Sequence, residues 1–101
     1  MGKTIAIDFD GVVHRYSKGY KDGSIYDKPV KGVRKAIARL KRKGFRVVVF
    51  TARTNRADVG VWLIKHGIDI DEITNIKPRA VAYIDDRAIR FTSWRDVGKY
   101  F

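Results

Sequence analysis

Short hydrophobic runs alternate along the chain with a segment of helical periodicity. Residues 5–7 and 47–49 are continuous apolar runs, typical of strands buried on both faces, and the second run is entirely β-branched. Between the two runs, apolar residues recur at helical spacing, which predicts a helix that begins near Pro29 and ends at Gly44. The apolar side of this helix would consist of Val30, Val33, Ala36, Ile37 and Leu40.

The second half of the chain continues this alternation with shorter elements. Asn55, followed three residues later by Asp58, predicts the start of a second helix that ends near residues 66–67. The candidates for burial in this helix are Val59, Leu63, Val61 and Trp62. Short strands are expected within residues 68–74, 81–84 and 88–91, and Ser93 with Asp96 has the spacing of a capping box for a final short helix.

The succession of strand, helix and strand predicts a parallel βαβ unit and therefore an α/β fold. The chain has 101 residues, 45% of them hydrophobic, and we expect residues 1–101 to form one compact domain. The absence of cysteine excludes disulfides, thiolate metal sites and cysteine nucleophiles. No apolar run approaches the roughly 20 residues of a membrane span, and the N-terminus has no signal-peptide pattern. We therefore expect a cytoplasmic protein with no membrane partner.

The formal net charge of +11 is concentrated in one part of the chain. Residues 28–57 hold eleven lysines and arginines and no acidic residue, whereas the rest of the chain holds eleven of each sign. Such a block favours nucleic acid or another polyanion as a partner. The predicted first helix would run away from the carboxyl edge of the strands, however, so half of the block would lie far from a site at that edge. A solvated, charge-rich helix face is the simpler interpretation.

Acids and a hydroxyl follow three of the predicted strands. Asp8 and Asp10 come at the end of the first, Thr51 after the second, and Asp85 and Asp86 after residues 81–84. The carboxyl ends of parallel strands share one edge, where open α/β sheets bind ligands. Taken alone, the first acid pair is equally compatible with a surface turn. Four converging carboxylates need a cation, and an all-oxygen ligand set favours Mg²⁺ over zinc or copper.

These residues resemble the four motifs of the haloacid dehalogenase (HAD) superfamily. Residues 8–12 (DFDGV), 50–51 (FT), 77–78 (KP) and 84–86 (IDD) match motifs I to IV in order, in spacing and in the strands that precede them. The resemblance extends from residue 5 to residue 91, and four motifs in sequence are far more specific than the acid pair alone. It implies a three-layer Rossmann-like fold, with a mostly parallel central sheet flanked by helices.

The resemblance also implies a role for each motif residue. Asp8 would be the nucleophile that forms an aspartyl-phosphate, and Asp10 would act first as an acid and then as a base. The phosphate-binding groups would be Thr51, the backbone N–H of Ala52, and Lys77. Mg²⁺ would be held by a carboxylate oxygen of Asp8, the backbone carbonyl of Asp10, and Asp85, with Asp86 close by or acting through water.

Within the superfamily, an aspartate at the second position of motif I is typical of phosphatases and phosphomutases. Mutases normally carry a cap domain, but only 40 residues separate Asp10 from Thr51 and 25 separate Thr51 from Lys77, so no cap fits. In an open site water can reach the phosphorylated intermediate, which favours a phosphatase over a mutase. Without a cap, the long polar and aromatic segment 14–27 is the expected substrate-facing loop or small hairpin.

The leading expectation is a minimal, cap-less, Mg²⁺-dependent phosphatase for a phosphorylated small molecule. One alternative is a phosphatase for the 3′ ends of nucleic acid, and another is a non-catalytic phosphate- or nucleic-acid-binding module, which would have no need of Asp10. A homo-oligomer is compatible with each, since uncapped relatives can borrow a neighbouring subunit as a lid. The residues expected to meet substrate are Arg15, Tyr16, Lys18, Tyr20, Lys21, Arg53, Arg56 and Arg87.

Overall fold

The computed structural model describes residues 3–76, 78–85 and 89–101. In these ranges the chain alternates strands and helices as the hydrophobic pattern predicts. In chain order the elements are β1 (Thr4–Asp8), α1 (Val33–Arg42), β2 (Arg46–Phe50), α2 (Arg56–Lys65), β3 (Glu72–Thr74), β4 (Ala82–Asp85), β5 (Ile89–Arg90), α3 (Trp94–Val97) and the 3-10 helix η1 (Gly98–Tyr100).

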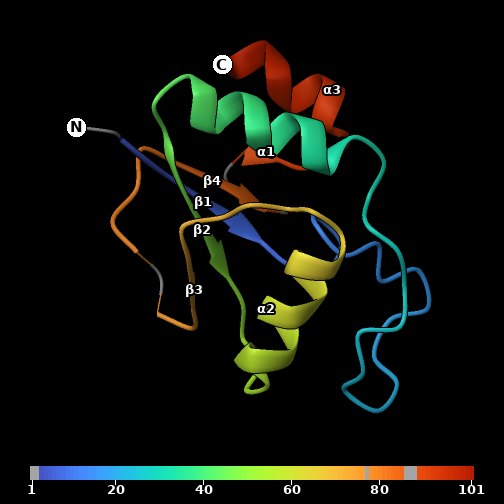
Figure 1. The fold of residues 1–101 in the computed structure, drawn as a ribbon. Coiled ribbons are helices and arrows are strands. Elements are labelled where there is room, and N and C mark those ends of the chain that lie inside the picture. The colour runs from blue at the N-terminus through green and yellow to red at the C-terminus, as the bar shows by residue number, and fades with distance from the viewer. Residues whose placement is uncertain (1–2, 77, 86–88) are drawn as a thin grey trace.

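The strands form one parallel sheet in the order β3-β2-β1-β4-β5 (Figure 1). In β1, Asp8 pairs with Phe50 of β2, and Ile7 pairs with Ile84 of β4. The chain moves outward from β1 to β2 and β3 and then returns to the other side of β1 to form β4 and β5. β1 and β4 therefore flank the point where the strand order reverses, which is where α/β sheets bind ligands. The predicted α/β class with a parallel sheet is confirmed.

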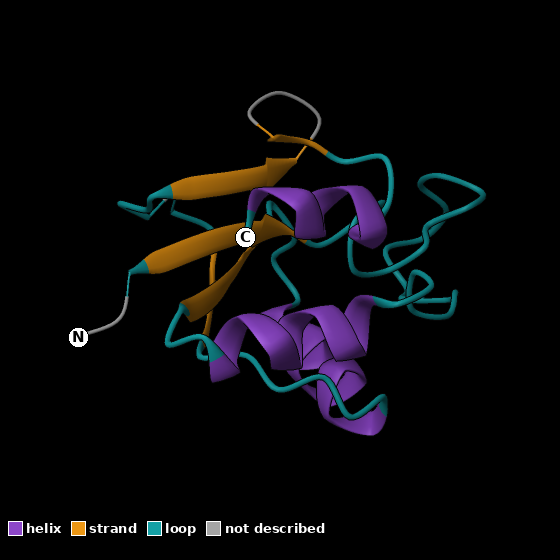
Figure 2. Ribbon diagram, turned by 90° about the horizontal axis from the view of Figure 1, so that it is seen from above, coloured by secondary structure: helices purple, strands orange, loops and turns teal. Residues whose placement is uncertain are grey.

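A hydrophobic core lies between one face of the sheet and the helices. Ile5 and Ile7 of β1 share this face with Val47 and Val49 of β2, and all four side chains are fully buried. The same core cluster contains apolar residues of α1, α2 and α3, so all three helices pack on this face (Figure 2). The helical layer expected on the opposite face is not formed by any described residue, because the connection from β3 to β4 contains no helix in its described part.

α1 begins later than the apolar spacing predicts. The helix starts at Val33, and Gly32 before it has a φ of 85°. A left-handed residue cannot continue a right-handed helix toward the N-terminus. Pro29 lies instead in an antiparallel bridge with His14, so the backbone before α1 is paired with the neighbouring loop. The prediction of a helix from Pro29 is wrong for this reason.

The starts predicted for the other two helices, and the end predicted for α2, are confirmed. α2 follows Asn55 and ends at its C-cap His66, and Ser93 caps α3 by accepting the N–H of Asp96 at 3.1 Å. Within α2, the buried residues are Val59, Trp62 and Leu63. Val61, in contrast, is 66% exposed, because the helical rotation of about 100° per residue turns it away from the core.

Candidate functional site

The carboxyl edge of the sheet gathers the acids and the hydroxyl that the sequence singles out. Asp8 is the last residue of β1, Asp85 is the last residue of β4, and Thr51 directly follows β2. The strand register pairs Asp8 with Phe50, the last residue of β2. It also pairs Ile7, which precedes Asp8, with Ile84, which precedes Asp85. Three adjacent strands therefore end together at the reversal point of the sheet. The predicted residues Lys77 and Asp86 lie outside the described residues.

Thr51 and Ala52 form the start of the loop that follows β2. Thr51 is only 2% exposed, and its Oγ1 accepts the backbone N–H of Arg53 at 3.1 Å. This bond uses a lone pair of the hydroxyl, whose own hydrogen can be donated to a ligand oxygen. Oδ1 of Asp8 accepts the N–H of Phe9 at 2.9 Å, which orients that carboxyl group at the end of β1.

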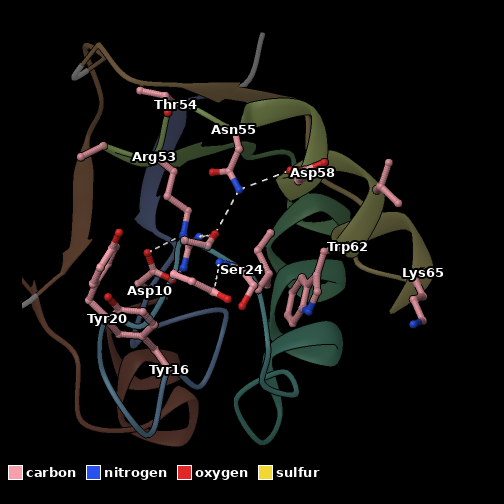
Figure 3. Close-up of a pocket in the computed structure, with 15 residues that line it drawn as sticks. Asp10, Tyr16, Tyr20, Ser24, Arg53, Thr54, Asn55, Asp58, Trp62 and Lys65 are labelled. Atoms are coloured by element: carbon pink, nitrogen blue, oxygen red, sulfur yellow. Dashed lines mark hydrogen bonds and ion pairs between the residues drawn. The ribbon is translucent and has the colours of Figure 1, made fainter.

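Asp10 is held by two residues that sequence reasoning did not assign to it. Arg53 donates Nε–H to Oδ2 at 2.8 Å and Nη2–H to Oδ1 at 3.0 Å, a paired contact that matches the guanidinium to the carboxylate (Figure 3). Nδ1 of His14 lies 2.9 Å from Oδ1. The Asp10 side chain is 25% exposed, whereas His14 is fully buried. The carboxylate of Asp10 is therefore fixed in orientation but open to a ligand on one side.

The hydrogen bond at Nε2 of His14 indicates which ring nitrogen carries the hydrogen. Nε2 accepts the backbone N–H of Asp27 at 3.0 Å, and a backbone N–H can only donate. Nε2 is therefore unprotonated, and Nδ1–H donates to Asp10. Asp10 then accepts three N–H bonds through its two carboxylate oxygens. Because a carboxylate offers about four acceptor positions, one position on Oδ2 stays available for a proton or a ligand.

The His14 ring is also a packing element at the base of the loop. It stacks on Phe9 at a centroid distance of 5.4 Å and meets the edge of Trp62 at 5.5 Å and of Tyr26 at 5.4 Å. The backbone of this residue pairs with Asp10 on one side and with Pro29 on the other. One buried imidazole thus joins the end of β1, helix α2 and both ends of the loop.

The loop of residues 14–27 is closed by its own hydrogen bonds. Asp27 accepts the N–H of Ser17 at 3.0 Å and its Oγ–H at 2.5 Å, and these bonds hold the pKa of Asp27 well below its ordinary value. The Tyr26 hydroxyl donates to the carbonyl of Gly19 at 2.8 Å. The tip of the loop is tied to the sheet edge, because the carbonyl of Gly23 accepts Nη1–H of Arg53 at 2.6 Å. The predicted substrate-facing segment therefore lies directly beside Asp10.

A groove of about 940 Å³ opens between this loop, the residues after β2 and one side of α2. Figure 3 shows Tyr16 and Tyr20 near Asp10 on one side and Trp62 on the other. Of the residues expected to meet substrate, Tyr16, Tyr20 and Arg53 line the groove, and Ala52 does so as well. The remaining lining residues are Asp10, Asp22, Gly23, Ser24, Ile25, Thr54, Asn55, Asp58, Val61, Trp62 and Lys65.

The basic block lies largely away from this groove. The last turn of α1, with Arg39, Lys41 and Arg42, is at the opposite edge of the sheet, where β2 begins. Lys41 forms ion pairs there with Asp69 at 2.8 Å and with Asp71 at 3.5 Å, and these carboxylates raise its pKa. The expectation that half of the basic block points away from the site edge agrees with this geometry.

Among the residues that the structure describes, no group of three or more acidic, histidine or cysteine side chains is gathered closely enough to hold a metal ion. The ligand set implied by the family resemblance includes the side chain of Asp85 and Asp86, neither of which is described. The donors that are placed at the edge, the carboxylate of Asp8 and the backbone of Asp10, are oxygens. Oxygen donors suit a hard cation such as Mg²⁺ and do not suit soft metals.

Two solved structures resemble this fold. A conserved protein from Bacteroides thetaiotaomicron superimposes with a TM-score of 0.75 at 18% identity, over 96% of this chain and 87% of that chain. A protein from Vibrio cholerae superimposes with a TM-score of 0.62 at 28% identity, over 87% of this chain and 83% of that chain. No protein-family model and no curated protein matches the sequence. These similarities support the α/β fold.

No helix among the described residues is both long enough and apolar enough to cross a lipid bilayer.

Proposed function

We propose that this protein is a phosphatase that hydrolyses a phosphate monoester through an aspartyl-phosphate on Asp8. The observation that carries the proposal is the common edge of β1, β2 and β4, where Asp8 and Asp85 are the last residues of their strands and Thr51 directly follows β2. A nucleophile, a hydroxyl donor and a second carboxylate are the groups that phosphoryl transfer needs in one place.

In the first step, an Asp8 carboxylate oxygen attacks phosphorus, and the bond from phosphorus to the leaving oxygen breaks. For this step Asp10 must carry a proton on Oδ2, at the acceptor position that Arg53 and His14 leave open, and it passes this proton to the leaving oxygen, which departs as an alcohol. In the second step, the Asp10 carboxylate takes a proton from water while the water oxygen attacks phosphorus. Asp8 is then regenerated and inorganic phosphate is released. The ionised form of Asp10, with one acceptor position left on Oδ2, is the form that the second step requires.

A divalent cation fits the oxygen donors at this edge. Asp8, the carbonyl of Asp10, and Asp85 would hold Mg²⁺, with Asp86 beside them or acting through water, and the ion would neutralise charge on the phosphoryl oxygens. Thr51 and the N–H of Ala52 would bind phosphate oxygens, and Lys77 would add positive charge. The groove contains a larger number of acidic than of basic side chains, which argues for a small substrate rather than a nucleic acid end.

The test is the release of inorganic phosphate from p-nitrophenyl phosphate in the presence of Mg²⁺. We expect turnover to be abolished by Asp8→Asn and by chelation of the metal. The matched control is Asp69→Asn, because the side chain of Asp69 is 85% exposed at the opposite edge of the sheet. Turnover in Asp8→Asn at the wild-type rate would refute the proposal, provided that its unfolding curve shows a folded protein. Oligonucleotide binding without turnover on a broad phosphate panel would favour the binding module instead.

A further inference from the structure

The groove beside Asp10 differs in charge from the rest of the protein. Its charged lining residues are Asp10, Asp22, Asp58, Arg53 and Lys65, so it is slightly acidic in a chain with a formal net charge of +11. Polyanions such as nucleic acid need positive charge along their path. The expected basic contacts of the loop, Arg15, Lys18 and Lys21, are not among the groove-lining residues.

Apart from Asp10, the acidic residues that line the groove are Asp22 in the loop and Asp58 in α2. Arg53 and Asp10 form an ion pair, so their two charges offset each other. Asp22 accepts the N–H of Ser24 at 2.9 Å, and hydrogen bonds from the hydroxyl and then the backbone of Ser24 hold the pKa of Asp22 below its ordinary value, so it is ionised at neutral pH. Asp58 is exposed on the first turn of α2. Both acids are hydrogen-bond acceptors, so the groove favours a ligand that carries N–H or O–H donors.

The aromatic lining favours a flat ligand. Tyr16 has a φ of 54°, a left-handed conformation that costs energy in a residue with a side chain. This backbone holds its ring 5.8 Å from the Arg53 guanidinium and thus next to Asp10. Tyr20 is 77% exposed on the same side of the groove (Figure 3). Tyrosine rings beside an acceptor-lined cavity form a surface on which a flat ring can stack.

The size of the groove favours a single small molecule over a polymer. Its volume of about 940 Å³ lies at the upper end of the roughly 300–1,000 Å³ that small-molecule sites occupy. Hydrogen bonds from Arg53 and Asn55 to the carbonyl of Gly23 join its two walls, at 2.6 Å and 3.2 Å. A polymer that continued through the groove would have to break these bonds, whereas a single ring system would not.

We propose that this groove is the leaving-group subsite and binds one flat ring system that carries hydrogen-bond donors and no negative charge beyond its phosphate, as in a nucleoside monophosphate. The position of the phosphate at Asp8 rests on the proposed function. Binding of the ring by Tyr16, Tyr20 and the carboxylates of Asp22 and Asp58 does not, because it depends only on the groove.

The test compares two ligands that differ only by the ring, adenosine 5′-monophosphate and ribose 5-phosphate. Their dissociation constants for the intact chain are measured by calorimetry without Mg²⁺. We expect adenosine 5′-monophosphate to bind about five-fold or more tightly, the lower end of the effect of one stacked base. Tyr20→Ala should remove most of this preference and leave the affinity for ribose 5-phosphate unchanged.

The matched control is Tyr100→Ala, since Tyr100 is 67% exposed on η1 and does not line the groove. Equal affinity for the two ligands, absence of binding at millimolar concentrations, or equal effects of Tyr20→Ala and Tyr100→Ala would each overturn the proposal. Tighter binding of a 3′-phosphorylated oligonucleotide than of the mononucleotide would overturn it as well. Because binding is measured without turnover, a failure here is distinct from a failure of the Asp8→Asn test.

Discussion

Replacement of His14 by phenylalanine separates the hydrogen bonds of this residue from its packing. Phenylalanine keeps an aromatic ring of similar shape against Phe9, Trp62 and Tyr26, which surround the imidazole. It removes the donor to Asp10 at 2.9 Å and the acceptor for the Asp27 N–H at 3.0 Å. The substitution therefore tests whether the polar contacts at the base of the loop stabilise the fold.

The expected cost follows from the groups that lose a partner. The Asp27 N–H loses the ring nitrogen that accepts its hydrogen, and an unsatisfied donor of this kind costs about 1–3 kcal/mol. Asp10 still has Arg53, so its loss is smaller. We expect His14→Phe to lower the free energy of unfolding by about 2 kcal/mol. His14→Ala should cost about 4 kcal/mol, since it also removes the ring from a fully buried position.

Urea denaturation at neutral pH, followed by tryptophan fluorescence, measures both values. A loss of about 2 kcal/mol corresponds to roughly 8–16 °C in the melting temperature of a domain of this size. The matched control is His66→Phe, because His66 contacts Trp62 with its ring and the structure describes no hydrogen bond from that ring. The reasoning is refuted if His14→Phe unfolds at the wild-type urea concentration with an unchanged slope.

Three further predictions follow from other contacts. Arg53→Lys keeps the charge but cannot form the paired contact, so we expect kcat for phosphate release to fall roughly ten-fold. The control Arg42→Lys, in the last turn of α1 at the opposite edge of the sheet, should leave kcat unchanged, and a wild-type kcat in Arg53→Lys would contradict the prediction. The lowered pKa of Asp27 means that its stabilising contribution is present above about pH 4 and is lost as the pH falls further. Asp27→Asn should therefore lose less of its urea midpoint than wild type between about pH 5 and pH 3, and parallel losses would argue against this role. Gly32→Ala should cost about 1–2 kcal/mol in urea unfolding because φ is 85°, whereas Gly98→Ala, at a φ of −58°, should be nearly neutral; equal costs would show that the backbone conformation is not the cause.

The strands and most helix boundaries could be predicted from sequence because their causes are local. Continuous apolar runs form β1 and β2, and Ser93 caps α3 through a residue three positions away. The start of α1 could not be predicted in this way. Its apolar spacing continues to residue 30, but the bridge between Pro29 and His14 and the conformation of Gly32 stop the helix at Val33.

The sequence by itself determined the positions of Asp8, Thr51 and Asp85 at strand ends, and the parallel sheet made those ends one edge. The partners of Asp10 were decided only by the tertiary structure. His14 lies four residues away, a spacing that is open to many loop conformations, and Arg53 lies 43 residues away. Long-range hydrogen bonds depend on how the loop of residues 14–27 packs against β2 and α2, and hydrophobic periodicity carries no information on that packing. For the same reason, only the folded chain shows that a protein with a net charge of +11 has an acidic, aromatic groove beside its candidate site.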